Sequence, residues 1–154
     1  MSPSTTKSIC EAAREAHAAL RQALDGMDYC LDWRPQPGEW SAREIVSHLL
    51  RHGHALNQAA RQALHGDTPT WEPPRGQPLL APERREQEMA ELLAEVDQSA
   101  TEALALLSSN TERQALPEDS SGQPRLSGLV AAEYREHWPE HVRQLSQIRY
   151  SLGL

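Results

Sequence analysis

The chain has 154 residues, with 22 acidic against 15 basic side chains and a formal net charge of −7. This length is typical of one domain, and we expect a single domain over residues 1–154. The negative charge repels the phosphate backbone that supplies most nucleic-acid affinity, which disfavours a nucleic-acid partner. No segment approaches the roughly 18 apolar residues of a membrane span, and the first residues carry no secretory pattern. We therefore expect a cytoplasmic protein that has no membrane partner.

The first predicted helix opens after Pro3 and spaces its apolar residues, from Ile9 to Met27, at steps of three and four. Residues 29–40 follow as a predicted loop, because two prolines and a glycine within four positions break any helix.

The second predicted helix has a strong start signal, since Ser41 is followed three residues later by Glu44 in the capping-box pattern. It is expected to run to about His65, with Gly66 ending it. A proline-rich connection follows, which is long enough to cross one end of a helical bundle.

Two further helices are predicted, from about Glu83 to Ser108 and from about Ser127 to Tyr150, with a polar loop around Pro117 to Pro124 between them. Four helices with one apolar stripe each favour an all-α four-helix bundle. The long link between the second and third helices predicts a crossover rather than a simple up-and-down order.

The direction of the histidines distinguishes a candidate site from ordinary surface. On a helical wheel His48 and His52 fall on the apolar stripe of the second helix, whereas His54 and His65 fall on the opposite side. We expect the first two side chains to face the core and the other two to face water.

In the last helix, His137 and His141 occupy the centre of the apolar stripe, one turn apart. That spacing lets two imidazoles reach one metal ion. A shared metal would satisfy all four inward histidines, which otherwise need hydrogen-bond partners in the core. The alternative is that each is an ordinary core histidine, bonded to a backbone carbonyl or to Tyr134.

The opposite face of the last helix is predicted to be a solvated, charged surface. Its members are Glu133, Glu136, Glu140, Arg143 and Gln147. The string from His137 to His141 also matches the H-x-x-E-H zinc-protease motif, but no acidic residue follows to act as a third ligand. Pro139 is expected to disturb the helix, because it lacks an N–H and clashes with the carbonyl of Arg135.

Two segments carry a resemblance to a known family. Residues 37–49 read PGEWSAREIVSHL and residues 134–145 read YREHWPEHVRQL. Together they resemble the DinB-like (YfiT-like) superfamily of metal-dependent enzymes. The resemblance implies a four-helix bundle of up-down-down-up order that holds a divalent metal ion through three histidines, which correspond here to His48, His137 and His141.

The resemblance also bears on function. The family includes S-transferases that use low-molecular-weight thiols, a maleylpyruvate isomerase and a colibactin-modifying hydrolase. We therefore expect a hydrolase or thiol S-transferase that acts on a small-molecule substrate, with a thiol as a further candidate cofactor and a homodimer as a candidate assembly. Imidazole ligands suit Zn²⁺, Ni²⁺, Fe²⁺ and Co²⁺ alike, so the metal is left open.

His52 is the position at which this sequence departs from its relatives, many of which carry an acidic or aromatic residue there. We expect it to be the catalytic base, with a fourth metal ligand as the alternative. The tryptophans are candidates either for pocket walls or for packing at the bundle ends: Trp33, Trp40, Trp71 and Trp138. The competing function is a non-catalytic, metal-stabilised bundle that acts as an interaction or stress-response module.

Overall fold

The computed structural model describes residues 3–67, 80, 82–113 and 126–154, and this part of the chain contains helices and no strand. The long helices are α1 (Pro3–Ala23), α2 (Ala42–Leu64) and α4 (Met89–Arg113), and a short α3 (Pro82–Glu86) precedes α4. A fourth rod consists of α5 (Leu126–Ala132), the π-helix η1 (Glu133–His137) and α6 (Trp138–Ser151). The predicted all-α bundle of four rods is confirmed.

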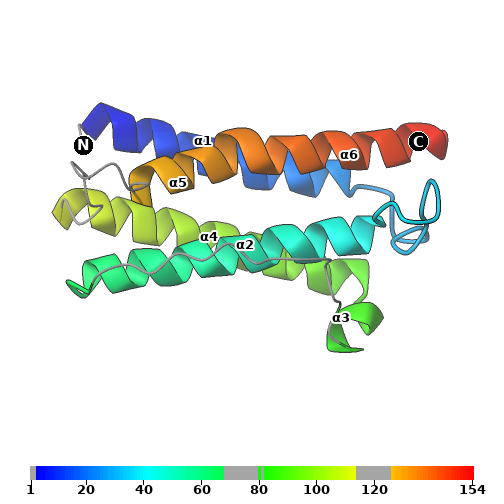
Figure 1. Cartoon of the computed structure of the whole chain (residues 1–154), viewed down its shortest axis with the longest axis horizontal. Helices are drawn as coiled ribbons and strands as arrows, with labels where there is room; N and C mark the ends of the chain where they lie inside the picture. Colours follow the sequence, from blue (N-terminus) through cyan, green and yellow to red (C-terminus); the bar gives the residue numbers. More distant parts are fainter. Residues whose placement is uncertain (1–2, 68–79, 81, 114–125) are drawn as a thin grey trace.

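Figure 1 shows the four rods side by side, with α1 and α6 running in one direction and α2 and α4 in the other. Contacts join α2 to α4, α4 to α1, α1 to α6 and α6 to α2, so the rods enclose one core. Most of the predicted crossover, and the polar loop around Pro117 to Pro124, lie outside the described residues. None of the helices in the described part of the chain is long and apolar enough to cross a bilayer.

The apolar stripes of the helices meet in this core. The largest fully buried side chains are Trp138, Ile9, Leu20, Leu24, Met27, Ile45, Leu49, Leu50, Leu92, Leu145, Ile148 and Val46. They come from α1, α2, α4 and α6 and from the loop after α1, so no rod can be removed without exposing the stripes of its neighbours.

The start of α2 is the capping box that its sequence predicts. Ser41 Oγ accepts a hydrogen bond from the Glu44 backbone N–H at 3.3 Å, and Glu44 Oε1 accepts one from the Ser41 N–H at 3.0 Å. Arg34 pairs with the same carboxylate oxygen at 2.8 Å. Gly66, just after the helix, has a φ of +79°, which favours glycine and fits its predicted role as the helix stop.

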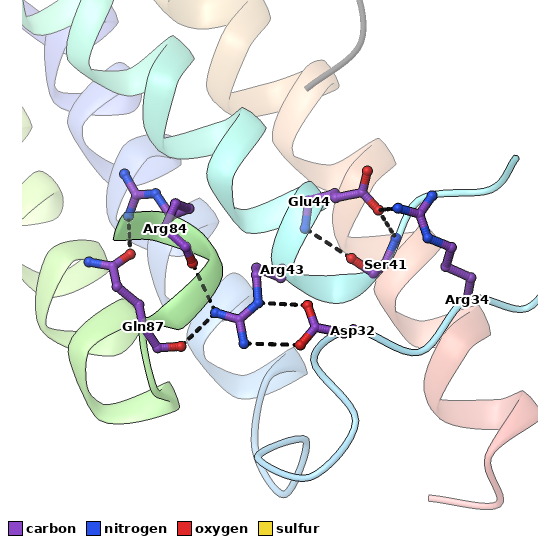
Figure 2. A network of polar contacts seen from close by, with 7 residues as sticks. All are labelled: Asp32, Arg34, Ser41, Arg43, Glu44, Arg84 and Gln87. Carbon is purple, nitrogen blue, oxygen red and sulfur yellow. Dashed lines mark hydrogen bonds and ion pairs between the residues drawn. The ribbon is translucent and has the colours of Figure 1, made fainter. Parts of the chain in front are cut away.

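The prediction of the third helix was wrong at its beginning. The helix is interrupted between Glu86 and Met89, so two helices, α3 and α4, form in place of one. Arg43 supplies the physical reason (Figure 2). Its Nη1 donates to the backbone carbonyls of Arg84 and Gln87 at 3.0 and 2.5 Å. These two hydrogen bonds from a buried guanidinium hold the backbone where the helix is interrupted. Its other nitrogens bind both carboxylate oxygens of Asp32, at 2.7 and 3.2 Å.

The fourth rod contains a π-helical turn where the sequence predicts a disturbed helix. The Trp138 backbone N–H donates to the carbonyl of Glu133, five residues back, which is the hydrogen bond of a π-helix. Pro139 follows immediately, and in a regular α-helix its ring would clash with the carbonyl of Arg135. The wider turn relieves this clash and changes the register of the side chains before it.

Candidate metal centre

Four histidines from two rods come together in the bundle, and we call them the histidine cluster: His48, His52, His137 and His141. The ring of His48 lies 4.4 Å from that of His52, 5.0 Å from that of His137 and 4.8 Å from that of His141, measured between centroids. The predicted inward direction of all four is confirmed. His54, on the other side of α2, is exposed as predicted.

The nitrogen positions in the cluster suit a metal ion. Candidate ligand atoms of His48, His52 and His137 all lie within 4.8 Å of one another. The Nε2 atoms of His48 and His137 are 3.0 Å apart. Two nitrogens on one tetrahedral zinc ion, each at about 2.0–2.1 Å, would be roughly 3.3 Å apart. These two nitrogens therefore need to separate by only roughly 0.3 Å to bind one such ion.

His141 also borders this group. Its ring centroid lies 4.8 Å from those of both His48 and His137. The structure thus brings together the three ligands that the family resemblance implies, and it places the predicted base His52 within the same group. Which three of the four imidazoles coordinate a metal stays a prediction.

Hydrogen bonds hold the two histidines of the H-x-x-x-H pair in a defined orientation. His137 Nδ1 lies 2.7 Å from Glu133 Oε1, and His141 Nδ1 lies 2.9 Å from Gln144 Oε1. Both oxygens are acceptors, so each Nδ1 carries the proton and donates it. The Nε2 atom of each ring then keeps its lone pair, which is the state required of a metal ligand.

Glu133 corrects the prediction of a wholly solvated face on the last helix. Its side chain is buried, with 6% of the residue exposed, whereas Glu136 and Glu140 are exposed as predicted. The prediction failed because it extended one α-helical register through η1, and a π turn takes up one residue more. The available signal was the spacing E-x-x-x-H-x-x-x-H, which places Glu133 one turn before His137.

Burial lowers the pKa of two histidines of the cluster, His48 and His141. Burial, followed by the neighbouring rings of His52, His141 and His137, lowers the pKa of His48 to about 3. Burial also lowers the pKa of His141, against the opposing effect of its bond to Gln144.

The carboxylate of Glu133 behaves in the opposite way. Its burial alone would raise its pKa, but hydrogen bonds from His137 and His52 outweigh this effect and bring the pKa to about 2. The site therefore combines two imidazoles with lowered pKa values, His48 and His141, with one nearby negative charge, a set that suits a divalent cation.

Trp40 forms one wall of the cluster. Its ring lies parallel to that of His141, at 5.5 Å and 2°, and it meets His48 edge-on at 4.9 Å. Together with Gln144 it also lines a cavity of about 330 Å³. Trp138 is instead fully buried packing, while Trp33 is partly buried against the core and Trp71 lies outside the described residues.

The sequence pattern left one buried histidine unassigned. His17 donates from Nδ1 to the carbonyl of Ala13 at 2.7 Å and has Ser99 Oγ at 3.4 Å from Nε2. Its ring packs on Trp138 with centroids 4.4 Å apart. His17 is thus a core histidine whose partners are internal, and burial lowers its pKa. His17 therefore packs against Trp138 and is not a member of the histidine cluster.

Close packing of the rods sets the position of the cluster. Gly53 follows His52 on α2, and a Cβ atom there would meet Ser99 Oγ at 3.2 Å and the Trp138 ring at 3.6 Å. The 3.2 Å contact is tighter than ordinary packing, so the absence of a side chain at Gly53 favours the close approach of α4 to α2 beside His52.

Comparison of the sequence with known proteins identifies the family of the chain. No match was found among curated proteins or among solved structures. The sequence model of the DinB superfamily matches residues 12–144, a range that contains the histidine cluster and Glu133. This match covers well over half of the chain and agrees with the resemblance noted from the sequence. The chain therefore belongs to the DinB superfamily.

Proposed function

We propose that the protein is a metal-dependent enzyme of hydrolase or thiol S-transferase type, in which His48, His137 and His141 hold a divalent metal ion. The observation that carries this proposal is the 3.0 Å approach of the His48 and His137 Nε2 atoms. The bonds that engage Nδ1 of His137 and His141 support it, because they leave Nε2 for the metal.

The donor set favours a catalytic ion over a purely structural one. Three neutral imidazoles leave the positive charge of the ion uncancelled, and a bound ion of this kind lowers the pKa of water toward about 7 and activates thiols similarly. Three nitrogen ligands also leave one position open for water or substrate in a four-coordinate zinc site.

His52 is proposed to act as a general base beside the metal. Its Nδ1 lies 3.5 Å from Glu133 Oε2, and its ring centroid is 4.6 Å from that of His137. The same proximity makes His52 the competitor of His141 for the third coordination position. The variants below separate these two assignments.

The cavity lined by Trp40 and Gln144 is proposed to receive a small-molecule substrate. It has a volume of about 330 Å³, and its wall touches the cluster through the stacking of Trp40 on His141. Because its lining contains three carboxamides, the hydroxyl of Ser151 and the carboxylate of Glu39, polar parts of a substrate could hydrogen-bond there.

Metal analysis of untagged protein tests the ligand set. We expect about one equivalent of metal in the wild type, and its loss in His48→Ala, His137→Ala and His141→Ala. The matched control is His54→Ala, which removes an exposed imidazole from α2. Loss of metal in His52→Ala, with retention in His141→Ala, would move His52 into the coordination shell and His141 out of it.

Turnover assays test the catalytic part of the proposal. The wild type and metal-stripped protein would be assayed with a panel of electrophiles, with and without low-molecular-weight thiols, and with ester and amide substrates. We expect metal-dependent turnover that His52→Ala lowers by about 10²–10⁴-fold if it removes a general base. Stoichiometric metal without turnover in the whole panel would favour the non-catalytic, metal-stabilised bundle.

A further inference from the structure

Glu133 is the one buried carboxylate that contacts the histidine cluster in the described part of the chain. Its Oε1 accepts hydrogen bonds from His137 Nδ1 at 2.7 Å and from Trp138 Nε1 at 3.1 Å. Its Oε2 lies 3.5 Å from Nδ1 of His52. One carboxylate thus faces one imidazole from each of the two rods that build the site.

The burial of this carboxylate requires an explanation, because burying a charge is strongly unfavourable unless partners compensate it. An apolar side chain at position 133 would avoid that cost and could pack against Trp138. The partners of Glu133 are instead the Nδ1 atoms of two cluster histidines, and the carboxylate can only accept hydrogen bonds.

We propose that Glu133 is a positioning residue, which holds His137 and His52 as Nδ1–H tautomers, so that Nε2 of His137 is available to bind the metal ion and Nε2 of His52 is available to accept a proton. This inference rests on the proposed metal site and extends it to a residue outside the ligand set. The carboxylate also places a negative charge behind the ligands, which makes the Nε2 lone pair of His137 more basic. Partners of this kind typically contribute 10–100-fold to metal affinity.

The π turn is the backbone feature that makes this arrangement available. Glu133 and His137 are the first and last residues of η1, which ends two residues before Pro139. The turn brings Glu133 from the predicted solvated face into the core, next to His137. Pro139, which is not a ligand itself, therefore helps to determine which carboxylate supports the site.

The main test compares Glu133→Gln with Glu136→Gln. Both substitutions remove one negative charge from η1, but Glu136 is exposed, which makes its variant the matched control. Zinc affinity would be measured by competition with a chromophoric chelator. We expect Glu133→Gln to weaken zinc binding by about 10–100-fold, and Glu136→Gln to bind zinc like the wild type. Equal affinities in all three proteins would overturn the inference.

A second readout separates positioning from general stability. Nitrogen-15 NMR of the imidazoles in the metal-free wild type, at pH 8, should show the proton on Nδ1 of His137 and His52, and Glu133→Gln should redistribute it. A wild type with the proton on Nε2 of His137 would overturn the inference even if the variant fails to fold. A wild type that binds no zinc but has the Nδ1–H tautomers would instead refute the proposed metal site and leave the tautomer assignment standing.

Discussion

Acidification should destabilise the metal-free protein through its histidine cluster, before most carboxylates titrate. Burial, together with the rings of His52, His141 and His137, lowers the pKa of His48 from 6.5 to about 3. The unfolded chain therefore binds a proton that the folded chain excludes. The stabilisation is complete above pH 6.5 and is lost progressively as the pH falls from 6.5 toward 3.

The size of the effect follows from the distance between the pH and the unfolded pKa. Each pH unit below 6.5 removes up to about 1.4 kcal/mol per group, so about 2 kcal/mol is lost at pH 5 through His48. Because this ring is only partly buried, solvent screening reduces the expected loss to about 1–2 kcal/mol. Burial also lowers the pKa values of His17 and His141, which adds a loss of the same sign.

Urea denaturation of chelator-treated protein at pH 7.5, 6.5 and 5.0 would measure this loss. His48→Gln should remove about 1–2 kcal/mol of the pH dependence between 7.5 and 5.0. His54→Gln, on the exposed side of α2, should leave the dependence unchanged. The reasoning fails if the wild type loses less than about 0.5 kcal/mol over this range, or if His48→Gln keeps the full loss.

Three further predictions address the fold and the metal. Arg43→Ala removes the donor to the carbonyls of Arg84 and Gln87, and it should lower the free energy of unfolding in urea by about 2–3 kcal/mol. The control Arg51→Ala, on the exposed side of α2, should change this free energy by less than about 0.5 kcal/mol. Ser41→Ala removes the capping box of α2 and should lower the same free energy by about 1 kcal/mol; no change would show that the cap contributes nothing. Chelation should lower the melting temperature of the metal-loaded protein at pH 8, because an ion that binds only the folded state stabilises it by mass action. A melting temperature that chelator does not change would contradict the metal site.

The wrong prediction for Glu133 shows where a helical wheel, which assumes one regular α-helix, no longer applies. The wheel placed His137 and His141 on the core side, and this placement is correct. The two residues lie within or after η1, so they share a register with Leu145 and Ile148. It misplaced Glu133, which lies at the start of the π turn. Pro139 indicated that the helix was disturbed but not in which direction the preceding side chains would rotate, because that depends on what they pack against.

Local spacing in the sequence determined the helical class of the protein, the cap at Ser41 and the inward direction of the histidines. These features depend on contacts within one or two turns, which residue order alone specifies. Only the tertiary structure decided that His48 Nε2 and His137 Nε2, 89 positions apart, approach to 3.0 Å. It also decided that Arg43 binds the backbone where the third helix divides, and that Glu133 is buried behind two imidazoles. Such contacts depend on how closely whole rods pack, and that closeness is set by many side chains at once rather than by any local pattern.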